Sequence, residues 1–583
     1  MGLQSDPPGT HSEPTCEELT KLFMNGQLAT EMAHRFNLNN PDALRKIQVC
    51  CAGLHNNGTL DLLQLIESSA MQRLAGSDFF MAMHFFCDIL PELEATPERM
   101  MTCIEALVTR GGEDLAANQP NGAFRSWCQK DPNRARKVIL AAHNGDELAS
   151  RHVAFALEAI ADIAEARKMA ITYNDARRLA AITALGRIHD LDPASCAETL
   201  AAFSTLLAGG ADDKLRANML RSITEILTRN PVFASPDAVA LVHRLVENGG
   251  DFTIHECSHM LWASRQTLSP DIVTGLLKKL IHLNPANKGT VNELDIGLQS
   301  LLEHGHEEAA ISFVTELLAL PDGSLELQEF DSFIRTLLDG PPERLGRIVV
   351  QWLLLGIPHL CKGLAEILQS DDMVGPPIHL SADQLDISPT AQLFLCRKAI
   401  GWFFLKPTTA TSILVSVLRV CDAETAKEVQ ALLVEHLLLN YHGVREHLEA
   451  LPSDDLAKSR VDQALEQHNI HFNAVRAIPP IKELQPSEHY RRIQQLHWSD
   501  QMRDAYNQPK NQSVLMSIVK RSVLLYGNSC RTFVKDSMTN MPRPVDIELH
   551  QLGVSFAVPR MEIIDPAGLQ WILFNYKHEK LTS

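Results

Sequence analysis

Residues 213–227 read DKLRANMLRSITEIL, in which apolar side chains recur every three or four positions without a Gly or Pro. This spacing predicts an amphipathic helix with one buried face. The Asp at its start belongs to a series of Asp and Asn residues at intervals of 38, 38, 36 and 35 residues: Asp175, Asp213, Asp251, Asn287 and Asp322. Asp and Asn are favoured N-caps, so we expect a helix to begin at each. The middle of the chain is therefore predicted to repeat one helical unit.

Each predicted unit contains two helices. Apolar pairs follow the caps at similar offsets, namely Ile182 with Leu185, Leu220 with Ile223, Leu294 with Leu298, and Phe330 with Phe333, while the third unit keeps Leu261 and has Ser258 at the other place. A second amphipathic segment then follows in each unit, at 197–207, 238–246, 272–281 and 309–318. The two helices of one unit cannot fully cover each other's apolar faces, so neighbouring units must stack to bury them. The fold class predicted is mostly α, a helical-repeat array or α-solenoid.

In its period and its paired amphipathic helices, the chain resembles the HEAT/armadillo class of α-solenoids over residues 131–370, and more loosely over the helical region 15–130. The resemblance implies stacked helix pairs whose exposed helices bind a protein partner. From the repeat we expect a concave or ridge surface made by successive second helices.

The flanking segments have other patterns. Val545, Ile547 and Leu549 alternate with polar residues, as do Val554, Phe556 and Val558, which predicts a β-hairpin turning through 550–553. Asp565 and Pro566 are an N-cap and first residue for a final helix. Together with Pro-, Asp- and Gly-rich breaks, these patterns predict a disordered leader at 1–14, linkers at 371–388 and 478–486, a helical capping or extension region at 389–477, and a small C-terminal α+β module at 487–583.

The composition favours helices and an acidic surface. Of 583 residues, 45% are hydrophobic and only 6% aromatic, and 53 Lys and Arg face 71 Asp and Glu for a net charge of -18. Such a chain repels the phosphate backbones of DNA and RNA, so we do not expect it to bind nucleic acid along its whole length. Its negative charge favours instead a protein partner that has a basic segment. Residues 486–583 differ, with 12 Lys and Arg against 9 Asp and Glu. A nucleic-acid contact through the C-terminal module is therefore kept as an alternative.

The cysteines and the most apolar segments indicate a soluble, cytoplasmic protein. Twelve Cys are scattered through apolar runs without a C-x-x-C pair, which predicts buried thiols in a reducing compartment. The start of the sequence has no basic n-region and no apolar h-region, and the most apolar stretch, 348–360, is too short to span a membrane.

One sequence motif is typical of a catalytic metal site. His255, Glu256 and His259 form an H-E-x-x-H match on a predicted helix. One helical turn separates the two imidazoles, so they could share a zinc ion while Glu256 deprotonates a bound water, and in this the chain looks like the zincin metallopeptidases. Zincins need a third ligand downstream, but no Glu occurs between Met260 and Asn292, and Glu293 lies 34 residues past His259. The repeat register assigns His255 to half-buried packing and His259 to the surface.

The preferred interpretation is a protein-interaction scaffold or adaptor without cofactor, and more likely not an enzyme. No G-x-x-x-x-G-K-[ST], G-x-G-x-x-G or G-x-S-x-G sequence is present, so the usual phosphate loops and the main clue to a serine hydrolase are missing. The alternatives are a zinc-dependent hydrolase using His255, Glu256 and His259, and a component of a nucleic-acid-associated assembly.

Overall fold

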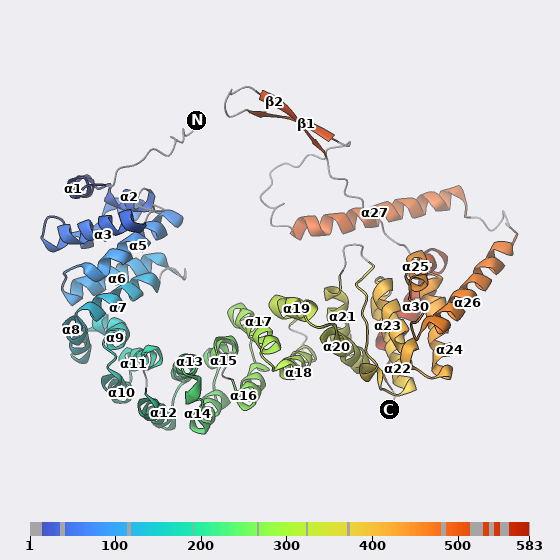
Figure 1. Cartoon of the computed structure of the whole chain (residues 1–583), viewed down its shortest axis with the longest axis horizontal. Helices are drawn as coiled ribbons and strands as arrows, with labels where there is room; N and C mark the ends of the chain where they lie inside the picture. Colours follow the sequence, from blue (N-terminus) through green and yellow to red (C-terminus); the bar gives the residue numbers. More distant parts are fainter. Residues whose placement is uncertain are drawn as a thin grey trace. The chain divides into compact units, whose positions relative to one another are not determined.

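The computed structural model is mostly helical, as predicted (Figure 1). It describes residues 14–34, 41–112, 118–189, 192–264, 268–321, 325–369, 374–479, 486–512, 529–535, 542–548 and 559–581. The chain divides into two compact units, Met1–Asp339 and Gly340–Ser583, which are described separately. The boundary between them falls inside the range 131–370 that was predicted as repeats.

The first unit is built from short helices joined by tight turns. In chain order they are α1 (Cys16–Met24), α2 (Leu28–His34), α3 (Pro41–Asn56), α4 (Ser69–Arg73), α5 (Ser77–Ile89), α6 (Pro97–Gly111), α7 (Gln119–Lys130), α8 (Pro132–His143), α9 (Glu147–Ala159), α10 (Ile163–Thr172), α11 (Ala176–Arg187), α12 (Pro193–Ala208), α13 (Asp213–Arg229), α14 (Pro236–Glu247), α15 (Asp251–Ala263), α16 (Pro270–Leu280), α17 (Lys288–Glu303), α18 (Glu307–Leu318) and α19 (Asp331–Leu338).

From α9 onward these helices form two rows. The first helices of the units, α9, α11, α13, α15, α17 and α19, pack each against the next, and the second helices, α10, α12, α14, α16 and α18, do the same. The array is curved, with the first helices on its inner, concave side and the second helices on its outer side (Figure 1). Tandem stacking of helix pairs is what the period predicted.

The predicted caps are only partly correct. Asp175 and Asn287 cap α11 and α17 by accepting hydrogen bonds from the main-chain N–H groups of Arg177 at 3.0 Å and Thr290 at 3.3 Å. The cap of α13 is Asp212 rather than its neighbour Asp213, since the Asp212 carboxylate accepts from Leu215. Helix α15 has Gly250 at its cap position, and Asp322 lies outside the described residues.

Helix α15 is instead capped from the preceding unit. The Asp213 carboxylate accepts hydrogen bonds from the main-chain N–H groups of Gly250, Phe252 and Thr253 at 2.6, 2.9 and 3.2 Å, and from the Thr253 hydroxyl at 2.6 Å. Asp295 of α17 serves α19 in the same way, accepting from Ser332 and Phe333, each at 2.9 Å. The orphan N–H groups of one first helix are thus satisfied by a carboxylate of the previous one, which fixes the stacking of units.

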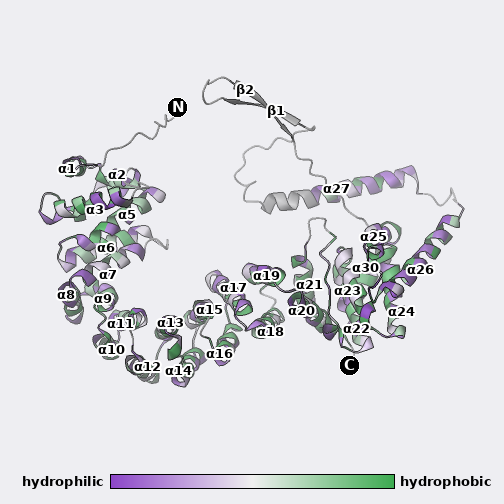
Figure 2. Cartoon of the chain, in the orientation of Figure 1, coloured by the Kyte–Doolittle hydropathy of each residue, from purple (hydrophilic) through white to green (hydrophobic). Residues whose placement is uncertain are grey.

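The apolar pairs predicted from the repeat form the core of the array. Ile182, Leu185, Leu220, Ile223, Leu294, Leu298, Phe330 and Phe333 are all fully buried. The close packing of α11 on α13 also requires a glycine at position 186, because a Cβ built there would lie 2.7 Å from the Cα of Ser222. Figure 2 shows the resulting division of the helices into hydrophobic and hydrophilic faces.

The cysteines differ in part from the prediction of buried thiols. Cys16 and Cys50 form a disulfide that links α1 to α3, with their Cα atoms 5.8 Å apart. Nine other described cysteines are free and buried, and burial raises the pKa of several of them, among them Cys51 to about 12. The disulfide could not be predicted from spacing, because the two residues are 34 positions apart in a chain of many cysteines.

The second unit is also helical. Its elements are α20 (Pro342–Leu355), α21 (Pro358–Ile367), α22 (Pro389–Phe403), α23 (Pro407–Val420), α24 (Ala423–Leu432) with a π-helix continuing it (Leu433–Leu438), α25 (His442–Glu449), α26 (Lys458–Ala477), α27 (Glu488–Gln512), β1 (Ser529–Lys535), β2 (Pro542–Glu548), α29 (Arg560–Ile564) and α30 (Pro566–His578). Part of the predicted linker 371–388 is packed: the main-chain N–H groups of Ile378 and Leu380 donate to Ser412 and Ser416 of α23.

The predicted separate α+β module at 487–583 is not supported. The strand at Pro542–Glu548 pairs antiparallel with Ser529–Lys535, while the predicted turn at 550–553 and the segment 554–558 lie outside the described residues. The final helix, which does begin after Asp565, packs on α22. Arg397 there makes an ion pair with Glu579, at 2.7 Å, and the buried Lys398 donates to the Lys577 carbonyl at 2.7 Å. The C-terminal residues thus complete the helical region instead of forming a separate module.

In the described part of the chain, no helix combines the length and the apolar character needed to cross a membrane.

Candidate binding groove on the first helices

The three residues of the H-E-x-x-H match lie on α15, where each faces a neighbouring helix. His255 is half-buried, and its Nδ1 lies 3.2 Å from the hydroxyl of Thr290 on α17. The Glu256 carboxylate pairs with Arg221 of α13, with Nε and Oε2 2.6 Å apart. Burial raises the pKa of Glu256, and Arg221 opposes this. The predicted general base is therefore held in an ion pair between repeats.

His259 is not the surface residue that the register predicted, since only 14% of its side chain is exposed. Arg221 covers one side of the ring, with Nη1 3.0 Å from Nε2. On the other side Nδ1 lies 3.6 Å from the Glu293 carboxylate, to which the Trp262 indole N–H also donates. Long side chains from the preceding and following units bury a position that the sequence of α15 alone leaves exposed.

This environment does not fit a zinc ion. Glu293 does approach His259, as a third zincin ligand would, but the guanidinium of Arg221 lies against the other nitrogen and would repel a divalent cation. His255 is bonded to Thr290. Among the described residues, no group of three or more His, Cys, Asp or Glu could hold a metal ion.

The same environment predicts how His259 titrates. Burial, and then the charge of Arg221, lower its pKa to about 4, although Glu293 opposes the shift. In the unfolded chain the pKa of a histidine is near 6.5. Between pH 6.5 and pH 4, unfolding therefore makes His259 take up a proton, which favours the unfolded state. The free energy of unfolding should fall by up to about 3 kcal/mol as the pH drops through this range. We expect the NMR signals of the His259 ring to stay those of a neutral imidazole at pH 5.5.

A His259→Gln variant is the control for this assignment, because it cannot take up the proton. Its free energy of unfolding should fall less than that of the wild type over the same pH range. A ring that titrates near pH 6.5 in the folded protein would contradict the buried network.

Two hollows lie along the first helices on either side of Arg187. The hollow next to the H-E-x-x-H residues has a volume of about 360 Å³ and is lined from α11, α13 and α15 by Thr183, Arg187, Lys214, Ala217, Asn218, Arg221, Ser222, Glu225, Phe252, His255 and Glu256. Phe252 is 61% exposed at its edge. His255 and Glu256 are thus wall residues of a surface hollow.

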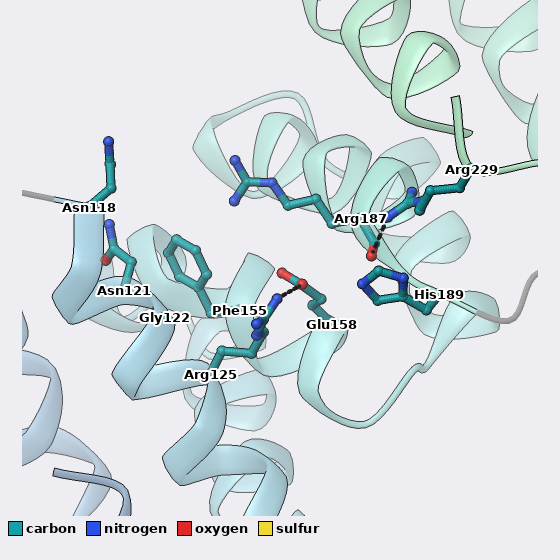
Figure 3. A pocket seen from close by; sticks show the side chains of 9 residues that line it. All are labelled: Asn118, Asn121, Gly122, Arg125, Phe155, Glu158, Arg187, His189 and Arg229. Atoms are coloured by element: carbon teal, nitrogen blue, oxygen red, sulfur yellow. Dashed lines mark hydrogen bonds and ion pairs between the residues drawn. The ribbon is translucent and has the colours of Figure 1, made fainter. Parts of the chain in front are cut away.

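The second hollow has a volume of about 530 Å³ and is lined from α7, α9, α11 and α13 (Figure 3) by Asn118, Asn121, Gly122, Arg125, Phe155, Glu158, Arg187, His189 and Arg229. Arg187 extends toward Phe155, while Arg125 forms an ion pair with Glu158 (Figure 3). Because Arg187 lines both hollows, they adjoin each other along α7 and the first helices α9, α11, α13 and α15, and we call the two together the groove.

The groove is basic in an acidic chain. Its walls carry five Lys and Arg, listed as Arg125, Arg187, Lys214, Arg221 and Arg229, against the three carboxylates of Glu158, Glu225 and Glu256. The sequence pattern did not predict this surface. These Lys and Arg residues lie at different distances from the helix start in successive units, so they do not recur with the repeat period. Only the stacking of the units brings them together along one groove.

Comparisons with known proteins add little to this description. No family model matches the chain, and no curated protein matches it. Among solved structures, the crystal structure of an engineered protein is similar at 13% sequence identity over 78% of this chain and 98% of that chain, with a TM-score of 0.18. The function proposed for the groove therefore rests on its own residues.

Proposed function

We propose that this protein is an interaction scaffold or adaptor of the HEAT/armadillo type that holds an extended segment of a protein partner in the groove of its first helices. The observation that carries the proposal is that two hollows with Arg187 in common lie next to each other along α7, α9, α11, α13 and α15. Stacked helix pairs commonly bind partners along such extended inner surfaces. The proposal moves the binding surface from the second helices, where we expected it, to the first.

Two exposed side chains in the groove are suited to contact a partner. Phe252 on α15 is an exposed aromatic residue, the kind that often anchors an interface, and its main-chain N–H is already bonded to Asp213. Lys214 on α13 is exposed and lines the same hollow. Both can be changed without opening the core.

A cytoplasmic location belongs to the same proposal, supported by nine free, buried cysteines against the single disulfide, Cys16–Cys50, of the described residues. The nucleic-acid alternative was assigned to residues 486–583, whereas the cations of the groove lie on helices of the first unit.

The proposal predicts that a Lys214→Glu, Phe252→Ala double variant loses its partner. Tagged protein is used for affinity capture from cells, and the captured proteins are quantified for wild type and variant. Loss of one aromatic anchor and reversal of one charge should reduce the amount of the specific partner at least tenfold.

The matched control is Lys137→Glu with Val232→Ala. Lys137 on α8 and Val232, which is 91% exposed, line neither hollow, so this variant reverses one lysine charge and truncates one exposed apolar side chain elsewhere. It should capture the partner as the wild type does. If the groove variant and the wild type retain the same proteins in the same amounts, the groove is not the binding surface.

A further inference from the structure

A separate hollow lies on the row of second helices, between α14 and α16, which pack against each other (Figure 1). It has a volume of about 440 Å³. Apart from Val246 and Gly275, its walls carry only polar side chains, namely His243, Arg244, Lys278, Lys279, His282 and Glu247. In a chain whose net charge is -18, three Lys and Arg and two His gathered around one Glu form a local basic surface.

The cations of this hollow are open to solvent and not neutralised. Arg244 and Lys278 are exposed, and Lys279 is half-buried. None of the three side chains makes an ion pair or a hydrogen bond in the part of the chain that the structure describes. Their charges are therefore available to an anion that enters the hollow, without first breaking a bond to a carboxylate.

Capping of the helix ends does not explain these cations. All three lie in the last turn of α14 or α16, where Lys and Arg often bond the free carbonyl groups. At the end of α14, however, Arg216 of α13 already donates from Nη1 to the carbonyls of Arg244 and Leu245, at 3.0 and 3.2 Å. The guanidinium of Arg216 thus adds positive charge at this helix end and leaves the Arg244 side chain free for another partner.

One histidine of the hollow is held between the two helices. A Cβ on Gly275 would lie 2.5 Å from Nδ1 and Cε1 of His243, so the imidazole of α14 rests on the main chain of α16. It can occupy this place only because residue 275 has no side chain. An imidazole N–H donor is therefore placed between the cations of the two helices.

We propose that this hollow binds a ligand that carries several phosphate groups close together. A phosphate group brings up to two negative charges and three strong acceptor oxygens, and Arg, Lys and imidazole N–H groups are suitable donors to it. Several such groups match a hollow of about 440 Å³ that is lined by Arg244, Lys278, Lys279 and two histidines. This site is distinct from the groove of the first helices and gives the scaffold a second ligand.

A compact polyphosphate fits this surface better than an extended polyanion. The lining comes from α14 and α16 alone. The neighbouring second helices, α12 and α18, have no basic residue in their last turns, so a nucleic acid that continued beyond the hollow would find no cations there. An acidic peptide offers only one charge per side chain, at intervals of about 3.4 Å or more, and neutralises the hollow less completely.

The test is isothermal titration calorimetry of the full-length protein with inositol hexakisphosphate, together with flotation on phosphatidylcholine vesicles with and without phosphatidylinositol bisphosphate. Arg244→Gln with Lys278→Gln removes one exposed cation from each helix and should weaken binding about tenfold or more, as expected for lost charged hydrogen bonds. Binding of the soluble probe alone identifies a free polyphosphate as the ligand. Flotation that requires the bisphosphate identifies a lipid headgroup as its source.

Arg136→Gln with Lys137→Gln is the matched control, because both residues are exposed on α8 and line none of these hollows. It removes the same charge and should bind as the wild type does. The inference is overturned if neither probe binds, if Arg244→Gln with Lys278→Gln binds as tightly as the control, or if a single-stranded DNA oligonucleotide or a Glu-rich peptide binds more tightly than inositol hexakisphosphate. Partner capture by the groove is a separate measurement, which the Arg244, Lys278 variant should leave unchanged.

Discussion

Gly186→Ala should lower the free energy of unfolding by about 2 kcal/mol, although Ala is the better helix former. The added Cβ would lie 2.7 Å from Cα and 2.9 Å from Cβ of Ser222, so α11 and α13 would have to separate. Ser222 cannot simply rotate away, because its hydroxyl donates to the Ile182 carbonyl at 2.7 Å and it is buried. Urea unfolding measures the loss, and hydrogen exchange should quicken first in α11 and α13.

Gly53→Ala is the matched control for this substitution. Gly53 lies inside α3, is exposed, and a Cβ there would meet nothing within 4 Å. The same change should therefore raise stability by about 0.5–1 kcal/mol. Equal effects at the two positions would show that α11 and α13 do not pack as closely as described.

Asp213→Ala should cost about 3 kcal/mol, since the Asp213 carboxylate satisfies three main-chain N–H groups and one hydroxyl at the start of α15. Asp212→Ala, its neighbour in sequence, removes an ordinary cap within α13 and should cost about 1 kcal/mol. Thermal unfolding of the two variants compares the costs. If Asp212→Ala is the more damaging, Asp213 does not connect the repeats.

The pH dependence of Asp213 provides a second measurement. Burial raises its pKa, but the hydrogen bonds from Thr253, Gly250 and Phe252 outweigh this and hold the pKa below its usual range. A carboxyl with a depressed pKa contributes its stability above about pH 4, where the unfolded group ionises, and that stability disappears as pH falls through the lower folded value. The difference between wild type and Asp213→Ala should therefore shrink below pH 4.

The sequence predicted the repeat because its signals are local. Apolar spacing and Asp or Asn caps act within a single helix, and they correctly identified the first helices and the buried pairs such as Ile182 and Leu185. They could not distinguish Asp212 from Asp213. The two are adjacent at the start of α13, where Asp212 is the cap and Asp213 the first helical residue, and Asp213 binds the next unit at Gly250 instead.

Pairings between distant segments were harder to predict. Alternation of apolar and polar residues around Val545 correctly indicated a strand, but alternation identifies a face and not a partner. The strand pairs with Ser529–Lys535, where Thr532 is opposite Val545. Likewise, the sequence of the final helix did not indicate that Glu579, just after it, would form an ion pair with Arg397, which lies 182 residues earlier in the chain.

The candidate site shows the same limit. His255, Glu256 and His259 were singled out by a motif within one helix, yet their roles are set by Arg221, Thr290 and Glu293 from neighbouring units. The basic groove itself leaves no periodic trace in the sequence. A surface assembled from five stacked helices becomes visible only when the stacking is known.

The central claim is that the first helices form the partner-binding surface. Its most direct measurement is the amount of partner captured by Lys214→Glu, Phe252→Ala relative to Lys137→Glu, Val232→Ala, with both variants shown to unfold at the same temperature as the wild type. We predict that the groove variant retains a tenth or less of the partner and the control variant retains all of it. Equal capture by the two variants would contradict the claim.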